Sequence, residues 1–461
     1  MAHAVVDVLA AQAAHDARQQ MQLFDHRVRH ADFGAGAGAN SVRWLGTSIA
    51  SLSSLQRVLV VGSFLRKDHP LFAQRIRQAA RKGAKVHSIN AVHGDWLMPM
   101  ASQLSAAPSL WLQALADVAV AVARAKGSNA PMPGQASDAA QAIASSLLSG
   151  ERKAVLLGNA AAQHPNATSL LALANWIAEQ TGASVGVIGE AANSVGAQLV
   201  NAMPGQGGLN AAQMLGAAPG AALKACLLLN LEPTLDAANA AAATAALQAM
   251  DLVVVMSPFK SAAADVADVL LPIAPFTETS GTFVNAEGRA QSFHGVVNPL
   301  GDTRPAWKLL RVLGNMLGLD GFEFETSEDV RAVALGDSAS IAARLNNGAA
   351  AAPMAAAANG ATLERIADVP IYATDSLVRR ATSLQLTADA RAPLASLPPA
   401  LWSQLGLNEG DRVRVSQGSA SAVLAARADP SLAHGCVRVP AGLPATSALG
   451  AMFGELRVEK A

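Results

Sequence analysis

Cysteine is almost absent from this sequence. The 461 residues include only two, Cys226 and Cys436. Two thiols are too few for the usual four-cysteine ligation of an iron–sulfur cluster, for a cysteine-rich zinc site or for a disulfide framework. Each cysteine lies in a stretch that predicts a strand, so we expect both to be buried thiols. No metal site is predicted in this chain.

Charge is also scarce and balanced. Lys and Arg number 34, Asp and Glu number 34, and together they make up 15% of the chain. Proteins that bind nucleic acid usually carry a basic excess, so nucleic acid is not an expected partner. No stretch reaches the roughly 18 consecutive apolar residues of a membrane span. The first residues also lack the basic segment and following apolar stretch that are typical of a signal peptide. We therefore expect neither a membrane span nor a signal peptide.

Residues 57–90 predict a βαβ unit. RVLVVG (57–62) is typical of a strand buried on both faces of a parallel sheet. After a polar loop at 63–70, an amphipathic helix follows and ends at Gly83, and residues 84–90 form the second strand. The order recurs at 153–189 and again from 224, where we expect helices over 237–250 and 261–267. Three such units predict an α/β fold with doubly wound, Rossmann-like layers.

The pattern changes after residue 335. Residues 336–361 are rich in Ala, Asn, Ser and Gly, which predicts a solvated linker or a loose alanine helix. Beyond them, apolar residues alternate with a period near two between turn signals such as Glu409-Gly410, which predicts a small C-terminal β-barrel. The expected organisation is an N-terminal helix over 1–25, a first Rossmann-like α/β region over 26–222, a second over 223–335, an Ala-rich linker over 336–365 and a barrel-like domain over 366–461.

The strongest motif is DVADVLLPIAPFTETSGTFVNAEGRAQ, residues 265–291. Proline cannot continue a central ladder, the glycines permit tight turns, and the Asn and Glu between them suit bonds to backbone groups. The stretch contains no nucleophile with its base, so we expect a structural hairpin and no catalytic residue. The positions to which we assign this structural role are Asp268, Pro272, Glu278, Gly281, Thr282, Asn285, Glu287, Gly288, Arg289 and Gln291.

This motif and residues 298–319 resemble the conserved block of the molybdopterin oxidoreductase superfamily. The fuller resemblance is to one component of the proton-translocating NADH-quinone oxidoreductase, respiratory complex I: the molybdopterin-oxidoreductase-like subunit designated G. It also includes residues 23–33, 61–86, 193–215 and 437–454. The resemblance implies that iron–sulfur clusters are carried outside this chain, in a preceding N-terminal region.

The resemblance also identifies the loops that hold a molybdopterin dinucleotide in the superfamily. Here they are residues 63–70, the end of a strand at Asn90 and residues 231–236. They offer few glycines for close approach to a phosphate, so we expect no cofactor in this chain and no bound molybdopterin. The candidates for vestigial pterin-loop positions are Gly62, Arg66, Asn90 and Asn230. Arg66 and Lys67 could meet an anion, although an exposed loop or a subunit contact is favoured.

Three functions are compatible with these patterns. The first is a redox-silent scaffold portion of the complex I component named above, peripheral on the cytoplasmic side of the inner membrane, with other peripheral-arm subunits of complex I as partners. The second is a fragment of a catalytic, formate dehydrogenase-like molybdopterin enzyme, but no cysteine precedes Arg57 to serve as the metal ligand. The third, a stand-alone nucleotide-binding module, depends on architecture alone.

Overall fold

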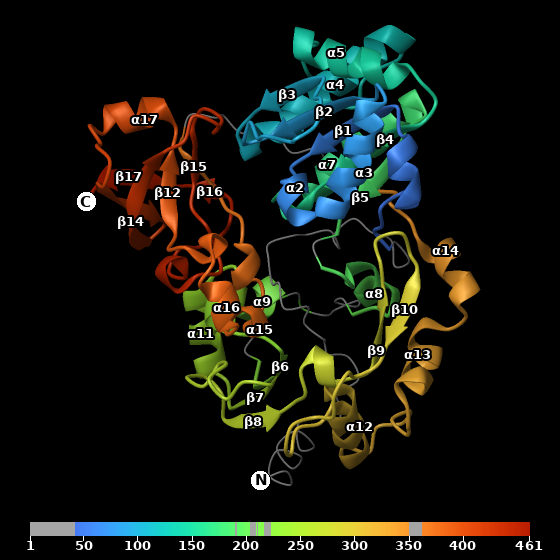
Figure 1. Cartoon of the computed structure of the whole chain (residues 1–461), viewed down its shortest axis with the longest axis vertical. Coiled ribbons are helices and arrows are strands. Elements are labelled where there is room, and N and C mark those ends of the chain that lie inside the picture. Colours follow the sequence, from blue (N-terminus) through green and yellow to red (C-terminus); the bar gives the residue numbers. More distant parts are fainter. Residues whose placement is uncertain (1–41, 190, 203–208, 210, 216–222, 350–361) are drawn as a thin grey trace.

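The computed structural model describes residues 42–189, 191–202, 209, 211–215, 223–349 and 362–461. It confirms the expected α/β fold with a barrel-like sheet near the C-terminus. Figure 1 shows a first parallel sheet with its helices at the top, a second sheet below it, and the C-terminal sheet beside both. The helix expected over 1–25 lies outside the described residues.

The first sheet has five parallel strands in the order β3-β2-β1-β4-β5. The order reverses between β1 and β4, and the carboxyl ends on either side of such a switch point are where open α/β sheets bind ligands. The strands are β1 (Arg57–Val61), β2 (Lys85–Asn90), β3 (Ser102–Ser105), β4 (Lys153–Leu157) and β5 (Ser184–Val187).

Strand β1 is buried on both faces because its side chains alternate between two apolar clusters. Val58 and Val60 pack in the cluster that contains Ile76, whereas Leu59 and Val61 pack in the cluster that contains Leu115. Helices therefore cover both faces of the sheet, as expected for a doubly wound fold. They are α3 (Pro70–Arg81) on one face and α4 (Trp111–Lys126), α5 (Asp138–Leu148) and α7 (Ala167–Thr181) on the other.

The second sheet has three parallel strands, β6 (Ala225–Leu229), β7 (Leu252–Ser257) and β8 (Val269–Pro272). The helix expected over 237–250 is shorter, α11 (Ala240–Gln248), because the Asn239 side chain caps it by accepting a hydrogen bond from the Ala242 N–H. The prediction of a short helix over 261–267 is wrong. Ala263 adopts a left-handed φ of 55°, which ends helical geometry, and the segment forms turns.

Two of the expected loops contain a helical turn. The loop after β1 includes α2 (Leu65–Asp68), and the loop after β6 includes α10 (Pro233–Asp236). The remaining short helices of the α/β regions are α6 (Asn159–Ala162), α8 (Ser194–Leu199) and α9 (Ala211–Leu215). Loops after parallel strands thus lead directly into helix starts, as in other α/β folds.

The motif at 265–291 ends in an antiparallel hairpin of β9 (Gly281–Val284) and β10 (Ala290–Phe293). Its tip reaches the part of the molecule built around the first sheet, here called the first lobe (Figure 1). There the Ala286 carbonyl accepts a hydrogen bond from the Leu45 N–H at 2.8 Å. The hairpin therefore connects the lower part of the molecule to the edge of the first sheet. Three helices follow it, α12 (Ala306–Met316), α13 (Ser327–Leu335) and α14 (Ile341–Arg344).

The described part of the segment 336–361, expected to be a solvated linker or a loose alanine helix, is mostly exposed and contains the helical turn α14, but two of its residues are buried. Ile341 and Asn347 are buried, and Leu345 forms a parallel bridge with Val42. At the other end of the expected linker, β11 (Glu364–Ile366) is a paired strand of the C-terminal sheet. Alanine-rich composition does not reveal the few larger side chains that pack this segment against the first lobe. Residues 350–361 lie outside the described residues.

The C-terminal sheet confirms the expected β-barrel as a nearly closed, mixed sheet in the order β16-β11-β15-β12-β14-β13-β17. Val413, Val415 and Leu424 point into its apolar core, in agreement with the period of two. Its strands after β11 are β12 (Leu394–Leu397), β13 (Arg412–Gln417), β14 (Ala420–Ala428), β15 (Cys436–Arg438), β16 (Gly454–Glu455) and β17 (Arg457–Lys460). Its helices are α15 (Ser376–Arg379), α16 (Thr382–Gln385) and α17 (Pro399–Gln404).

The two cysteines lie in strands. Burial raises the pKa of Cys226 to about 11, and burial together with Glu364 raises that of Cys436 to about 12. Both are therefore neutral thiols near pH 7, which are poor metal ligands. In the described part of the chain, no three His, Cys, Asp or Glu side chains are grouped to hold a metal, and no helix is long and apolar enough to cross a membrane.

Two histidines are buried in the first lobe. His164 packs against Trp111, its Nε2 lies 2.9 Å from the Pro108 carbonyl oxygen, and its Nδ1 accepts from the Asn166 N–H. Burial lowers the pKa of His164 to about 4 despite the bond to Pro108. The pKa of His87 is also lowered to about 4, by burial and then by Arg57 and Lys85. Both side chains are therefore neutral in the folded protein at pH 7.

These histidines should make the protein less stable in mild acid. Their folded pKa lies below the unfolded value near 6.5, so their contribution is complete above pH 6.5 and is lost as the pH falls towards 4. At pH 5 we expect a loss of about 2 kcal/mol for each histidine relative to pH 7. Unfolding followed by tryptophan fluorescence at the two pH values measures it. The variant His164→Gln should lose part of the pH dependence, and the exposed control His434→Gln should keep all of it. Equal stability at pH 5 and pH 7 would contradict this assignment.

Candidate functional site at the carboxyl ends of the sheets

Two of the predicted site residues, Gly62 and Asn90, meet at the switch point of the first sheet. The Asn90 Nδ2 donates to the Ser63 carbonyl at 2.8 Å, and its Oδ1 accepts from the Ala91 N–H. Gly62 has φ of +57°, and a Cβ there would lie 2.5 Å from the Ala161 nitrogen. The glycine thus permits the β1 loop to pack against α6 of the same chain.

Two polar atoms at this edge have no hydrogen-bond partner among the described residues. They are the Ser63 Oγ, directly after β1, and the Asn159 Oδ1, directly after β4. Buried polar groups are normally satisfied, so both are places where a water or a ligand atom would be stabilised. Neither group carries a charge.

A half-buried ion pair of the C-terminal domain lies against the loop at this edge. The Arg438 guanidinium donates to both carboxylate oxygens of Asp368, at 3.0 and 2.8 Å, and stacks over the ring of Phe64 in the β1 loop at 5.2 Å. Burial alone would raise the pKa of Asp368, but Arg438 outweighs it and lowers that pKa. The pair is therefore charged on both sides at neutral pH.

Backbone hydrogen bonds also join the C-terminal domain to this edge of the first sheet. The Ala433 N–H donates to the Ala91 carbonyl and the His93 N–H to the Ser431 carbonyl, at 2.8 and 2.7 Å. Glu364 of β11 accepts from the backbone N–H and the hydroxyl of Ser109. Residues after β2 and before α4 are thus bound directly to the C-terminal sheet.

The carboxyl end of the second sheet is closed in the same way. Glu232 and Asp236, which follow β6, are buried and accept from two consecutive arginines of the C-terminal domain. Arg379 lies 2.8 Å from Glu232 and 2.5 Å from Asp236, and Arg380 lies 2.5 Å from Glu232. Burial opposes the charged form of Glu232, but the bonds from Arg380 and Arg379 lower its pKa overall.

The other two predicted site residues lie apart from Gly62 and Asn90. Arg66, in the loop after β1, forms an exposed ion pair with Asp95 at 3.3 Å. Asn230 follows β6 in the second sheet, where its φ of 54° turns the chain and its N–H donates to the Met256 carbonyl. The four candidates therefore belong to the carboxyl ends of two different sheets.

The motif residues hold the strand ends and the hairpin. Asp268 accepts from the Val253 N–H at 2.6 Å and Glu278 accepts from the Leu300 N–H at 2.9 Å. Pro272 is the last residue of β8 and pairs with Ser257 of β7. A Cβ at Gly281 would lie 2.8 Å from the Phe293 ring, so this glycine permits the close start of the hairpin.

The remaining motif residues form the hairpin ladder and its tip. Thr282 bonds Ser292 across the strands, and the Asn285 Oδ1 accepts from the N–H groups of Glu287 and Arg289. Glu287 accepts from the Ile49 N–H at 2.7 Å, which binds the tip to the first lobe. A Cβ at Gly288 would clash with Leu345, whereas Arg289 and Gln291 are exposed.

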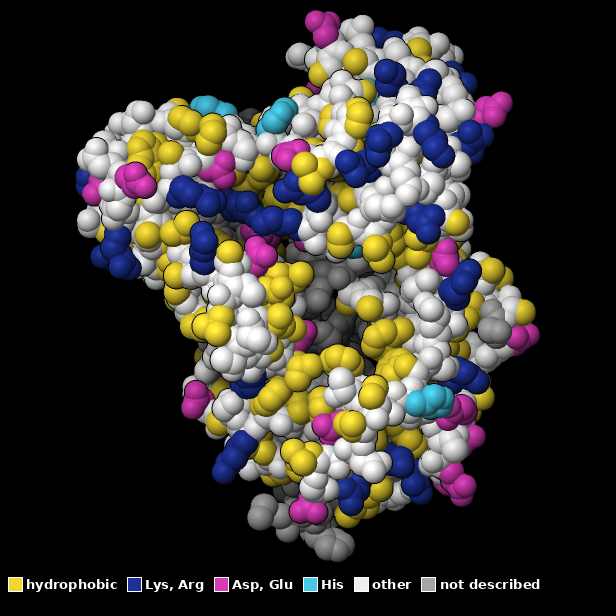
Figure 2. Space-filling view, viewed as in Figure 1, with side chains coloured by type: hydrophobic (Ala, Val, Ile, Leu, Met, Phe, Trp, Pro, Cys, Tyr) yellow, Lys and Arg dark blue, Asp and Glu magenta, His cyan; other side chains and the backbone are white. Residues whose placement is uncertain are grey.

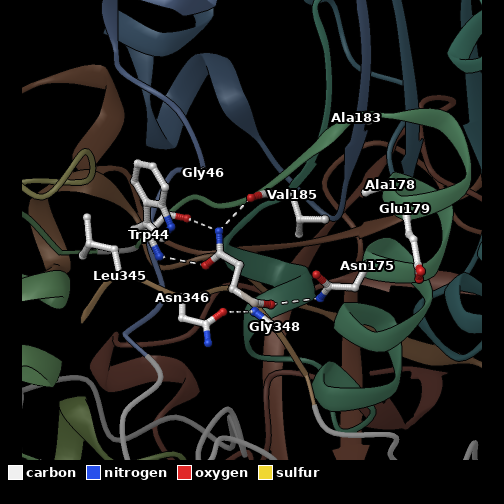
Figure 3. Close-up of a pocket in the computed structure, with 11 residues that line it drawn as sticks. Trp44, Gly46, Asn175, Ala178, Glu179, Ala183, Val185, Leu345, Asn346 and Gly348 are labelled. Atoms are coloured by element: carbon white, nitrogen blue, oxygen red, sulfur yellow. Dashed lines mark hydrogen bonds between the residues drawn. The ribbon is translucent and has the colours of Figure 1, made fainter. Parts of the chain in front are cut away.

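A surface pocket of about 420 Å³ lies elsewhere, on the outer edge of the first sheet (Figure 3). Trp44, Glu179 and Asn346 line it, and none of the predicted site residues does. The Asn347 amide accepts from the Trp44 N–H and donates to the Trp44 and Val185 carbonyls, so its hydrogen-bonding groups are used within the chain. The pocket is therefore an open surface depression beside residues 345–348.

The sequence reasoning missed the groups that close the two edges, Asp368, Arg438, Arg379 and Arg380. One signal was available, since Arg379 and Arg380 are adjacent cations within a chain of low charge content. Their carboxylate partners, however, lie 143 to 148 residues away, so no local spacing connects them.

Comparison with known proteins identifies the family. The model of the family described as "Molybdopterin oxidoreductase" matches residues 17–316. The chain belongs to the molybdopterin oxidoreductase family. A solved structure, acetylene hydratase from Pelobacter acetylenicus, shares the fold, with a TM-score of 0.65 and 14% identity over 93% of this chain and 81% of the other.

Sequence similarity to curated relatives is local. A Staphylococcus aureus strain USA300 protein named "Putative formate dehydrogenase" is 42% identical over 76 residues, and the like-named protein of bovine strain RF122 is 41% identical over the same length. The match spans 16% of this chain and only 8% of each relative. It supports membership of this oxidoreductase family without defining a reaction.

Members of the molybdopterin oxidoreductase family usually bind molybdopterin, which weighs against our expectation that this chain holds none. The described residues at the edges nevertheless fit a dinucleotide poorly. A diphosphate needs free cations or free backbone N–H groups, yet Arg438, Arg379 and Arg380 are paired with carboxylates. The close approach that Gly62 allows is taken by Ala161. Ser63 and Asn159 each offer an unsatisfied polar atom there.

The ion pairs at the carboxyl end of the second sheet should contribute strongly to the free energy of unfolding. The variant Arg379→Met removes one of the positive charges that balance two buried carboxylates. Breaking a buried ion pair typically lowers the free energy of unfolding by about 3 kcal/mol or more. We expect a clear fall in the thermal unfolding midpoint. The triple variant Arg379→Met/Glu232→Gln/Asp236→Asn should recover part of the loss.

An exposed pair in the same region is the matched control for this experiment. Lys224 and Asp251 lie 3.1 Å apart and both are more than half exposed. The variant Lys224→Met should lower stability by less than about 1 kcal/mol, because exposed ion pairs contribute little. Similar losses in Arg379→Met and Lys224→Met would show that the buried cluster is not a special stabilising contact.

Proposed function

We propose that this chain is a redox-silent scaffold portion of the molybdopterin-oxidoreductase-like component of the NADH-quinone oxidoreductase, respiratory complex I. In this role it supports electron transfer from NADH to quinone through iron–sulfur clusters that other polypeptide regions carry. It would lie in the peripheral arm on the cytoplasmic side of the inner membrane, in contact with neighbouring peripheral-arm subunits.

The closure of the ligand-binding edges is the observation that carries this proposal. Side chains of the C-terminal domain occupy the carboxyl ends of both parallel sheets and pair their own charges there. A family fold whose arginines at these edges, Arg379, Arg380 and Arg438, are paired within the chain is better suited to rigid support than to binding an anionic dinucleotide. The two cysteines, Cys436 buried and Cys226 half-buried, are both neutral thiols, which supports the same role.

Two further features support the assignment to this component of complex I. The hairpin of the family motif is used to connect two parts of the fold, since its tip bonds Leu45 and Ile49. The segments at 61–86 and 437–454, which carry part of the resemblance to that component, are brought together where Arg438 stacks on Phe64. The resemblance therefore concerns residues that hold the domains to one another.

A second candidate is a catalytic, formate dehydrogenase-like molybdopterin oxidoreductase of which this chain is a fragment. The local identity to the Staphylococcus aureus proteins favours it. The unsatisfied Ser63 and Asn159 atoms at the switch point are the groups that would contact a ligand in that case.

Metal and pterin analysis distinguishes the two. The chain is produced in a host that makes molybdopterin and is then assayed for molybdenum, tungsten, iron, acid-labile sulfide and oxidised pterin fluorescence. The scaffold role predicts far less than one equivalent of each per chain. A known molybdopterin enzyme produced in the same host is the positive control. Stoichiometric molybdenum or tungsten with pterin would favour the catalytic candidate instead, and stoichiometric cluster would contradict redox silence.

A further inference from the structure

Positive charge is concentrated in one short part of this neutral chain. Residues 57–85 contain eight Lys or Arg and one acidic residue, a net charge of +7, so the rest of the chain carries −7. Such an asymmetry creates a local positive field even though the whole protein is neutral. Much of this charge lies on helix α3 and at its C-terminal end.

Helix α3 directs its cations away from the protein. Ala73, Ile76 and Ala80 are buried against the first sheet, so the opposite face carries the charged residues. Arg77, Arg81 and Lys82 are exposed, and within the described residues none of them forms an ion pair with a carboxylate. Figure 2 shows dark-blue side chains gathered over this upper lobe. Unpaired cations on a rigid helix are available to a partner.

Two exposed leucines accompany these cations, one on the same helix and one whose carbonyl is bonded to Arg77. Leu71, in the first turn of α3, is 75% exposed, and Leu97, in the loop after β2, is 57% exposed. Leu97 adopts a left-handed φ of 50°, a conformation that leucine rarely takes. The Asp95 carboxylate accepts from its N–H at 2.9 Å, and its carbonyl accepts from the Arg77 Nε at 2.7 Å. The same bond that holds Leu97 outward also orients the guanidinium of Arg77.

This arrangement joins an oriented arginine to apolar side chains that project from the surface. Interface hot spots commonly have that composition, and strained backbone is often retained where it serves binding. Among the described contacts Arg77 donates only its Nε, so its two terminal nitrogens keep their donor capacity for a carboxylate.

We propose that the surface formed by Leu71, Arg77, Arg81, Lys82 and Leu97, here called the α3 surface, docks an acidic face of a protein partner. The carboxylates of the partner pair with the three cations, and an apolar pocket of the partner receives Leu97. The inference rests on the proposed function, in that the partner is a component of the peripheral arm.

The features of the α3 surface favour a protein over the other polyanions. The apolar side of α3 is buried in the core, so the helix has no face left to insert into a membrane. The α3 surface has no aromatic side chain on which a base would stack, and the −7 of the remaining chain repels an extended nucleic acid.

The test uses the full chain and the purified peripheral arm of NADH-quinone oxidoreductase prepared without it. The wild-type chain should bind the arm with an affinity that falls as salt rises. The variant Arg77→Glu/Arg81→Glu should bind about tenfold more weakly or worse, because like charges then face each other. Arg124→Glu/Lys126→Glu, which reverses two exposed cations in the last turn of α4, is the matched control and should bind within about twofold of wild type.

The variant Leu97→Gly separates binding from folding. Glycine adopts a left-handed φ without strain, so this variant should not lower the thermal midpoint. It should nevertheless weaken binding, because the apolar anchor is lost. Equal binding by wild type, Arg77→Glu/Arg81→Glu and Leu97→Gly would overturn the α3 surface while leaving the proposed function intact.

A second probe makes the two proposals separable. Binding of the same variants is measured to a random copolymer of glutamate and leucine, to duplex DNA and to phosphatidylglycerol vesicles. Binding to the copolymer that depends on Arg77 and Arg81, without binding to the arm, would support the α3 surface and contradict the proposed function. Tighter binding to DNA or vesicles through the same residues would overturn the protein partner, and no binding to any probe would overturn both proposals.

Discussion

The rest of this structure depends on compensation of buried charge between the C-terminal domain and the carboxyl end of the second parallel sheet. Glu232 and Asp236 after β6 can be buried only because Arg379 and Arg380 reach them, whereas Arg438 and Asp368 are half-buried and pair within the C-terminal domain. A buried carboxylate without such a partner would be costly to ionise or would take up a proton. The pairs at Glu232 and Asp236 thus set how the C-terminal domain meets the second sheet, and the stacking of Arg438 on Phe64 contributes to its contact with the first.

This constraint also bears on function. In an open α/β sheet the carboxyl edge is where a ligand finds backbone N–H groups and free side chains. Here the same edge is a domain interface, with Phe64 beneath Arg438 and Ala91 bonded to Ala433. Features that would define a cofactor site in another member of the family are used in this chain to join domains. The positions of Ser63 and Asn159 are the exception, because their polar atoms remain unsatisfied among the described residues.

Local sequence patterns predicted most of the regular structure. The βαβ unit at 57–90 follows from a β-branched strand, a helix between Pro70 and Gly83, and a second strand, and each signal acts over a few residues. Composition failed where single side chains mattered more than the average. Most of residues 336–349 are exposed, as expected for a linker, yet Ile341 and Asn347 are buried. At 261–267 a helical pattern was overridden by the left-handed Ala263.

The sequence by itself determined the order of strands and helices along the chain, the position of both cysteines in strands and the family motif, because these arise from periodicity and from residues close together along the chain. Only the tertiary structure decided that Asn90 bonds the Ser63 carbonyl, that Arg379 pairs with residues more than 140 positions away, and that Leu97 is held outward beside Arg77. Such pairings depend on where two distant loops come to lie once the sheets have packed. Physical proximity of that kind has no signature in the spacing of residues along a single sequence.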